Sequence, residues 1–232
     1  MVLGATGAVG SALVRELLAG REWASVSIFV RRPTRQFADA PGASKLSEHE
    51  MDLAHLEGDV AGELALRRDA HRGTLAAFCT LGVGEPSRVS RAELRRVDVG
   101  IAGAFARGCR SANVPHFSLL TAVGANPSSA LFYAKVKGEI EQQVTALQFE
   151  RASFFRPSLL VTQEVRFGMR DRLARALVPR IAPMLPSRYR EITVESLARA
   201  MRVNAELDGR RGDEVLEHDD FVRLSSRASL SS

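Results

Sequence analysis

Two side chains that could move a proton lie four residues apart in the stretch Tyr133-Ala-Lys-Val-Lys137. At this spacing a phenol and an ammonium group share one face of a helix. A free phenol has a pKa of about 10, and a neighbouring cation favours its anion, which brings proton transfer closer to neutral pH. The pattern predicts Tyr133 as a proton donor or acceptor and Lys137 as its activating cation. A surface pair on a solvated helix would look the same, so position must decide between the two interpretations.

A hydroxyl group precedes this helix in the sequence. Thr121 directly follows the expected strand Phe117–Leu120. In an open parallel sheet, ligands bind in the crevice outside the carboxyl ends of the strands. We therefore expect Thr121 to contact the same substrate oxygen as Tyr133, and we count it as the third candidate catalytic residue.

The chain begins with a glycine-rich turn between a short strand, Val2-Leu3, and a helix. A strand–turn–helix context of this kind is typical of dinucleotide-binding turns, in which helix N–H groups face the phosphates. Gly4 permits the tight turn, Gly7 lets the backbone approach a pyrophosphate, and Gly10 allows close helix–strand packing. The residues expected to bind the dinucleotide are Gly4, Thr6, Gly7, Ala8, Val9 and Gly10. With three residues before Gly4, either the first strand is unusually short or the given start is late.

The end of the second strand, expected at Ser25–Val30, decides between the two nicotinamide dinucleotides. An NAD-selective site has an acidic residue there, which accepts a hydrogen bond from the ribose 2′-hydroxyl. This chain has Arg31 and Arg32 instead. Guanidinium groups bind a 2′-phosphate through charge-assisted hydrogen bonds. The sequence therefore predicts NADP(H), with a solvated basic turn as the alternative interpretation.

Short apolar runs alternate with helical periods along the chain, which is typical of strand–helix units around a parallel sheet. Further strands are expected at Lys45–Met51, Leu75–Leu81, Ala152–Phe155 and Glu214–Glu217. Further helices are expected through Leu94, Val97, Ile101 and Phe105, and after Thr193 as N-cap. We predict an α/β fold, a Rossmann-like doubly wound sheet with helices on both faces. One domain should cover residues 1–224, with a small substrate-covering region at 162–224 and a frayed tail at 225–232.

Nearly the whole chain resembles the atypical short-chain dehydrogenase/reductases that are similar to the Tat-interacting protein oxidoreductases. The stretches that carry the resemblance are Phe78-Cys79-Thr80-Leu81-Gly82, Arg96-Val97-Asp98, His116-Phe117-Ser118-Leu119-Leu120, Tyr133-Ala-Lys-Val-Lys137-Gly138-Glu139 and Phe155-Arg156-Pro157-Ser158. The family usually has serine where Thr121 stands, and threonine keeps the hydroxyl but adds a methyl group.

The resemblance implies hydride transfer between NADP(H) and a small carbonyl or alcohol substrate. It implies Tyr133 as proton donor or acceptor, and Lys137 as its activator and a ligand of the nicotinamide ribose. The other cofactor contacts that it implies are Asp52 and Leu53 by the adenine, Leu81 and Gly82 along the cofactor, and Pro157 and Ser158 by the nicotinamide.

Composition limits the other classes of partner. The net charge of +5 is small and spread along the chain, and aromatic residues make up 6%, which disfavours nucleic-acid binding. No apolar run approaches the roughly twenty residues of a membrane-spanning helix, so no integral membrane contact is expected. Cys79 and Cys109 are expected to be buried free thiols in a cytoplasmic protein. The five histidines form no ligand cluster, so we assign no metal.

A non-catalytic alternative stays open. The protein could sense NADP(H) and act through a protein partner, because the segment Arg166–Arg190 carries seven arginines and a shared fold does not fix function. Epimerase or dehydratase chemistry on a sugar nucleotide is less favoured, since such enzymes usually have a longer region after the position of Val161. The sequence specifies neither the substrate nor the oligomeric state.

Overall fold

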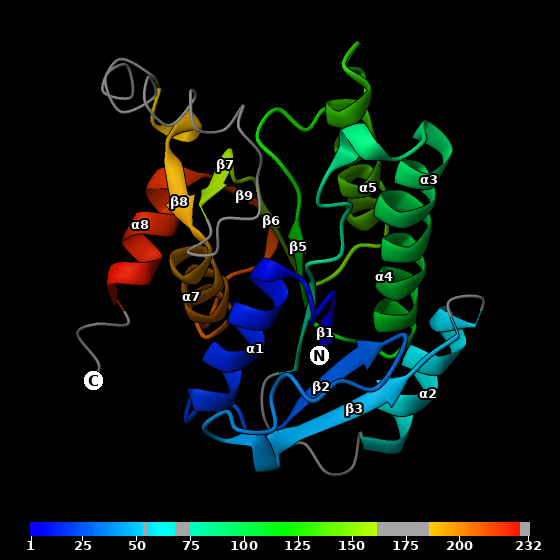
Figure 1. Ribbon diagram of the computed structural model, residues 1–232, viewed down its shortest axis with the longest axis vertical. Coiled ribbons are helices and arrows are strands. Elements are labelled where there is room, and N and C mark those ends of the chain that lie inside the picture. Colours follow the sequence, from blue (N-terminus) through cyan, green and yellow to red (C-terminus); the bar gives the residue numbers. More distant parts are fainter. Residues whose placement is uncertain (53–54, 68–74, 162–185, 228–232) are drawn as a thin grey trace.

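The computed structural model describes residues 1–52, 55–67, 75–161 and 186–227. Within these ranges, seven parallel strands form one sheet in the order β3-β2-β1-β4-β5-β6-β9 (Figure 1). The strands are β1 (Val2–Leu3), β2 (Val26–Val30), β3 (Leu46–Glu50), β4 (Ala76–Cys79), β5 (His116–Leu120), β6 (Arg151–Phe155) and β9 (Gly212–Leu216). The order reverses between β1 and β4, which creates the switch point where such sheets bind ligands. The predicted Rossmann-like α/β fold is confirmed.

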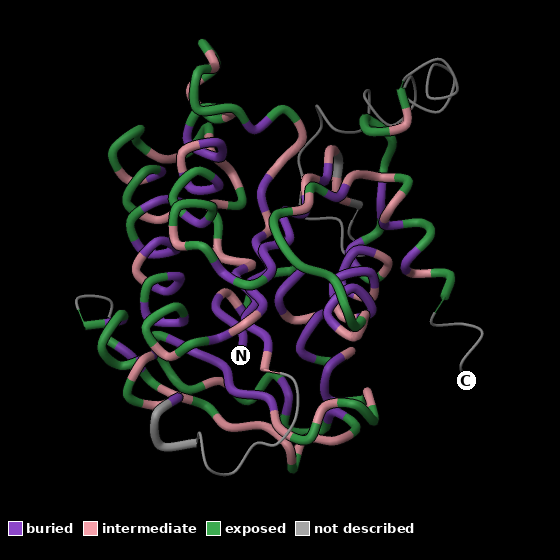
Figure 2. The backbone as a smooth tube through the Cα atoms, turned by 180° about the vertical axis from the view of Figure 1, so that it is seen from behind, coloured by how far each residue is buried: buried purple, intermediate pink, exposed green. Residues whose placement is uncertain are grey.

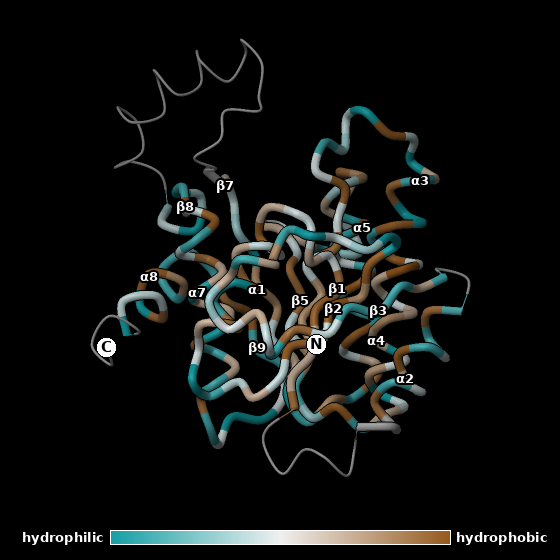
Figure 3. The backbone as a smooth tube through the Cα atoms, turned by 60° about the horizontal axis from the view of Figure 1, so that its bottom comes forward, coloured by the Kyte–Doolittle hydropathy of each residue, from teal (hydrophilic) through white to brown (hydrophobic). Residues whose placement is uncertain are grey.

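Helices cover both faces of this sheet (Figure 1). One face packs against α1 (Ala8–Ala19), α7 (Val194–Ala205) and α8 (His218–Arg227), and the other against α2 (Leu56–Arg67), α4 (Ala102–Ser111) and α5 (Phe132–Ala146). Figure 2 shows the resulting burial of the central strands, and Figure 3 shows that they are also hydrophobic. All residues of β2 and β4 are buried, as expected for a parallel sheet covered on both faces.

The first strand is short but central. β1 has two residues and pairs with both β2 and β4. Backbone hydrogen bonds from Phe78 N to Met1 O (2.8 Å) and from Thr80 N to Leu3 O (2.9 Å) extend its ladder. The Met1 amine is buried against the Ala76 carbonyl, and burial lowers its pKa to about 6. The short first strand is therefore held by its neighbours on both sides.

One predicted helix differs in its geometry. The sequence predicts a continuous helix through Leu94, Val97, Ile101 and Phe105, but the structure divides it into α3 (Arg91–Arg95), η4 (Arg96–Ile101) and α4. The segment η4 is a π-helical turn. Such turns are rare in proteins, and those that occur often lie at functional sites.

Short elements complete the described chain. They are η1 (Ala43–Lys45), η3 (Pro86–Arg88), η6 (Ser187–Tyr189) and a second, two-stranded parallel sheet of β7 (Leu159–Val161) and β8 (Glu191–Thr193). The N-cap prediction for α7 is confirmed, because Thr193 Oγ1 accepts a hydrogen bond from Ser196 N at 3.1 Å. Most of the arginine-rich segment 166–190 lies outside the described residues.

The C-terminal residues differ from the prediction. The predicted frayed tail over 225–232 is wrong for residues 225–227, because α8 continues to Arg227. This helix buries Phe221 and Leu224, whereas Val222 is exposed and the other residues are polar. Residues 228–232 lie outside the described part of the chain.

Candidate active site

The turn between β1 and α1 packs directly against the segment that follows β4. Gly4 has a φ of +88°, and a Cβ atom there would lie 2.5 Å from Leu81 N. A Cβ on Gly10 would lie 2.0 Å from the Gly4 carbonyl oxygen. By contrast, a Cβ on Gly7 would meet a single described neighbour, Gly4 O, at 3.4 Å. The turn is therefore closed towards the sheet at Gly4 and Gly10 and open at Gly7.

The start of α1 suits an anion. Gly7 is its N-cap, and no side chain caps the helix. The first N–H groups of a helix have no partner within the helix, and the positive end of the helix dipole attracts negative charge. A phosphate group at this position would satisfy both features.

A pocket of about 590 Å³ opens beside this turn. It is lined by Thr6, Val30, Arg31, Arg32, Met51 and Asp52. These residues follow or end three parallel strands, so they meet at one edge of the sheet. Four of the predicted cofactor residues, namely Thr6, both arginines and Asp52, are brought together here. Leu53, predicted beside them, lies outside the described residues.

Two lining residues were missed by the sequence analysis. Val30 is the last residue of β2, and Met51 follows β3. Both are apolar, so no polar signal marked them, and Val30 also continues the buried pattern of β2. Their position immediately before Arg31 and Asp52 is the signal that could have found them.

Tyr133 and Lys137 lie in the first turns of α5, as predicted. Tyr133 is 38% exposed, whereas Lys137 is 6% exposed. The Lys137 Nζ atom lies 5.6 Å from the centroid of the Tyr133 ring. The pair thus combines an accessible phenol with a buried cation, which a surface pair on a solvated helix would not show.

Lys137 has a second partner that the sequence analysis did not identify. Its Nζ donates a hydrogen bond to Asp98 Oδ1 at 2.5 Å, and Asp98 is 2% exposed. Burial by itself lowers the pKa of Lys137, but the facing Tyr133 and Asp98 groups outweigh it and raise the pKa above its ordinary value. The available signal was a lone acidic residue between the apolar residues Val97 and Val99.

Gly82 lies against this ion pair. A Cβ atom there would be 3.1 Å from Asp98 Oδ1 and 3.3 Å from Lys137 Nζ. The predicted cofactor residues Leu81 and Gly82 therefore connect the glycine turn at one end to the Lys137 site at the other. This places the two halves of the predicted site on either side of the switch point between β1 and β4.

Thr121 follows β5 as predicted, but its hydroxyl is engaged inside the fold. It is 5% exposed, and Oγ1 donates to Glu141 Oε1 (2.7 Å) and to the Phe155 carbonyl (3.3 Å). Arg156 donates to both oxygens of the same carboxylate, from Nε at 2.9 Å and from Nη2 at 2.5 Å. A contact between Thr121 and a substrate stays a prediction. Glu141 and Arg156 were missed, although Glu141 continues the Tyr133–Lys137 stripe at the next helical turn.

The remaining predicted residues follow β6 at the same edge of the sheet. The Pro157 carbonyl accepts a hydrogen bond from Val123 N at 3.0 Å. Ser158 Oγ donates to the Tyr189 carbonyl at 3.4 Å. Contacts of Pro157 and Ser158 with a nicotinamide remain predictions.

Relatives of known name match most of the chain. Protein HTATIP2 of Rattus norvegicus is 30% identical over 225 residues, which cover 96% of this chain and 87% of the relative. Protein FMP52, mitochondrial, of Coccidioides immitis is 28% identical over 236 residues, covering 96% of this chain and 94% of the relative.

The cytoplasmic location expected from the sequence is overturned by this comparison. Fungal relatives are named mitochondrial, so the cytoplasmic expectation is not kept. Cys79 and Cys109 are free and buried as expected. Every helix in the described part of the chain is too short or too polar to cross a bilayer.

Solved structures show the same fold. MoeE5 in complex with UDP-glucose and NAD has a TM-score of 0.65 at 18% identity, covering 98% of this chain and 81% of that one. A short-chain type dehydrogenase/reductase from Mycobacterium ulcerans has a TM-score of 0.65 at 18% identity, covering 95% of this chain and 88% of that one.

A family of NAD(P)H-binding domains matches residues 4–153. With the glycine turn, the adjoining pocket and these relatives in agreement, the chain belongs to the NAD(P)H-binding family, and HTATIP2 is among its relatives.

Proposed function

We propose that this protein is an NADP(H)-dependent oxidoreductase that transfers hydride to or from a small carbonyl or alcohol substrate. The observation that carries the proposal is that one edge of the sheet holds three features together. These are the open turn at Gly7, the pocket with Arg31 and Arg32, and the Tyr133–Lys137 pair.

The residues present fit a doubly phosphorylated nucleotide. The open face of Gly7 and the uncapped N-terminus of α1 suit the pyrophosphate. Arg31 and Arg32 are exposed in the adjoining pocket, where guanidinium groups suit a 2′-phosphate. When bound, NADP(H) would supply or accept the hydride.

The chain's own residues handle the proton. In the reducing direction, the Tyr133 hydroxyl donates its proton to the carbonyl oxygen, and in the oxidising direction the phenolate takes it back. Lys137 holds a positive charge beside the phenol throughout, and it would also bind the nicotinamide ribose. Thr121 would assist only if its hydroxyl left Glu141, so we assign it last among the three.

Cofactor choice is tested by calorimetry with NADPH and NADH on the parent and on Arg31→Gln/Arg32→Gln. Loss of charge-assisted bonds to a 2′-phosphate should weaken NADPH binding by about tenfold or more and leave NADH binding unchanged. Arg35→Gln is the matched control, because Arg35 is exposed on the same loop but does not line the pocket. Equal losses of affinity for NADPH and NADH would show that the arginines do not recognise the 2′-phosphate.

Catalysis is tested by NADPH oxidation over aldehydes, ketones and quinones. Tyr133→Phe should reduce turnover by about a hundredfold or more while leaving NADPH affinity intact. The alternative, a non-catalytic NADP(H) sensor, predicts no turnover in the parent, affinity indifferent to Tyr133→Phe and a protein partner recovered by pull-down. Absence of turnover on every substrate class would reject the enzymatic proposal.

A further inference from the structure

The cation beside Tyr133 lies closer to a carboxylate than to the phenol ring. Lys137 Nζ is 2.5 Å from Asp98 Oδ1, and the two side chains are 7% and 1% exposed. A buried charge without a partner is costly, so the ion pair accounts for how Lys137 stays protonated inside the fold. The pair as a whole carries no net charge.

The neighbouring ionisable groups do not alter this balance. Cys79 lies near Lys137 on β4, but burial raises the pKa of its thiol to about 12, so the thiol is neutral. The two acidic neighbours on α5 are themselves paired, Glu139 with Arg95 at 3.0 Å and Glu141 with Arg156. The Lys137–Asp98 pair is therefore the charged pair that the structure shows in contact with the phenol ring.

Asp98 is positioned by an unusual backbone conformation. Asp98 lies in the π-helical turn η4, between the regular helices α3 and α4. A π-turn adds a residue to the helical repeat and so turns a side chain away from its α-helical direction. The distortion coincides with the one buried carboxylate that Lys137 contacts.

A carboxylate and an ammonium act on a phenol with opposite signs. A lone cation favours the phenolate, and an anion held against that cation cancels most of the effect. We propose that Asp98 balances the charge of Lys137 and keeps Tyr133 in its protonated form, so that the site is poised to donate a proton in reduction. Asp98 is thus a positioning residue that acts through Lys137. Its link to reduction depends on the proposed function, whereas its effect on the phenol does not.

The chain has two tyrosines, Tyr133 and the exposed Tyr189, which permits a direct measurement. In a Tyr189→Phe background, tyrosinate absorbance during an alkaline titration reports on Tyr133 alone. Asp98→Asn should move this titration to lower pH by about one unit, because the Tyr133 phenolate then becomes the counter-charge that stabilises the buried Lys137 ammonium. Glu93→Gln is the matched control and should leave it unmoved, since Glu93 is a surface carboxylate on α3 bonded to Arg96. An unmoved titration in Asp98→Asn would overturn the proposal.

A second variant keeps the test valid if an unpaired Lys137 disturbs folding. Asp98→Asn/Lys137→Met replaces the ion pair with a neutral pair, a change that folded proteins often tolerate. Its tyrosinate should form at the same pH as in the parent. A large displacement of this titration in either direction would contradict the proposal that Asp98 balances the charge of Lys137. Circular dichroism checks the fold of both variants.

Enzyme assays then connect the balance to the reaction. In Asp98→Asn, alcohol oxidation with NADP⁺ should rise at lower pH than in the parent, by the same interval as the titration. The titration uses protein without cofactor or substrate. A displaced titration without any turnover would therefore reject the proposed function and leave the role of Asp98 standing. Turnover with an unmoved titration would reject the role of Asp98 and leave the proposed function standing.

Discussion

Single glycines in the first turn have separable roles that can be tested. Gly7 has an extended backbone conformation that alanine also adopts, and a Cβ there would make an ordinary van der Waals contact with Gly4 O at 3.4 Å. Gly7→Ala should therefore lower the free energy of unfolding by no more than about 1 kcal/mol, a loss expected because alanine is a poorer N-cap than glycine. The added methyl group would occupy the space of a bound pyrophosphate, so NADPH affinity should fall by about tenfold or more.

The matched variant is Gly10→Ala. Its Cβ would lie 2.0 Å from Gly4 O, inside the contact between turn and helix. Overpacking of this kind costs about 1–3 kcal/mol, so Gly10→Ala should lower the urea midpoint. If instead Gly7→Ala binds NADPH as the parent does, the pyrophosphate does not lie on this turn.

Which residues the sequence could reveal depends on how local their signals are. The glycine turn, Arg31-Arg32 and the Tyr133–Lys137 pair are each defined by spacing within a few positions. Asp98 is a different case, because it lies 39 residues from its partner Lys137. Only the folded chain brings these two together, so no spacing rule could have paired them.

At the scale of elements, α5 is fixed by a clamp at its third turn. Glu141 accepts hydrogen bonds from Arg156 at the end of β6 and from Thr121 at the end of β5. The carboxylate thus ties the Tyr133-bearing helix to two strand ends. Removing one partner of a buried pair leaves the other uncompensated.

Glu141→Ala should consequently lower the free energy of unfolding by about 2–3 kcal/mol, somewhat less than for a fully buried pair because Arg156 is partly exposed. Glu57→Ala breaks the exposed pair of Glu57 with Arg107 and should cost less than about 1 kcal/mol. Urea unfolding of both variants decides the matter. Similar losses in the two would mean that Glu141 is not a clamp.

The elements themselves were mostly predictable, with exceptions that have physical causes. Continuous apolar runs marked the buried strands, because a parallel sheet covered on both faces needs them. The π-turn η4 escaped detection since Leu94, Ile101 and Phe105 keep an ordinary helical spacing around it. Helix α8 escaped because only Phe221 and Leu224 are buried in a short, mostly polar segment, so no run of apolar residues marked it.

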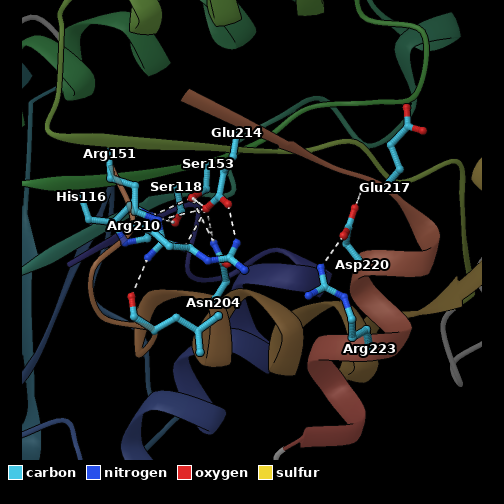
Figure 4. Close-up of polar contacts among 11 residues, drawn as sticks. His116, Ser118, Arg151, Ser153, Asn204, Arg210, Glu214, Glu217, Asp220 and Arg223 are labelled. Atoms are coloured by element: carbon cyan, nitrogen blue, oxygen red, sulfur yellow. Dashed lines mark hydrogen bonds and ion pairs between the residues drawn. The ribbon is translucent and has the colours of Figure 1, made fainter. Parts of the chain in front are cut away.

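At the scale of the whole molecule, a polar cluster joins neighbouring strands of the sheet to a helix (Figure 4). Glu214 on β9 accepts hydrogen bonds from Ser153, Asn204 and Arg151, and His116 Nε2 lies 2.8 Å from Ser153 Oγ. These residues come from three adjacent strands and from α7, so the cluster joins the outer strands to a helix.

Both ionisable ends of this cluster favour the folded state at neutral pH. Burial, followed by the nearby Arg151, lowers the pKa of His116 to about 3 from an ordinary value of 6.5. Burial would by itself raise the pKa of Glu214, but hydrogen bonds from Ser153, Asn204 and Arg151 outweigh it and hold the pKa at about 2. The unfolded chain takes up both protons at higher pH than the folded chain does.

Stability should therefore fall on acidification in two successive steps. Because the folded pKa of His116 is depressed, its contribution is complete above pH 6.5 and decreases from there towards pH 3. The contribution of Glu214 follows, between pH 4.5 and about 2. Between about pH 6 and 5, one proton bound only by the unfolded state costs about 1.4 kcal/mol for each pH unit. The glutamine side chain of His116→Gln cannot titrate, so this variant should lose the slope, whereas the exposed His55→Gln should keep it.

Urea unfolding at a series of pH values measures the difference between the two variants. An unchanged slope in His116→Gln would mean that the buried imidazole is protonated in the folded protein.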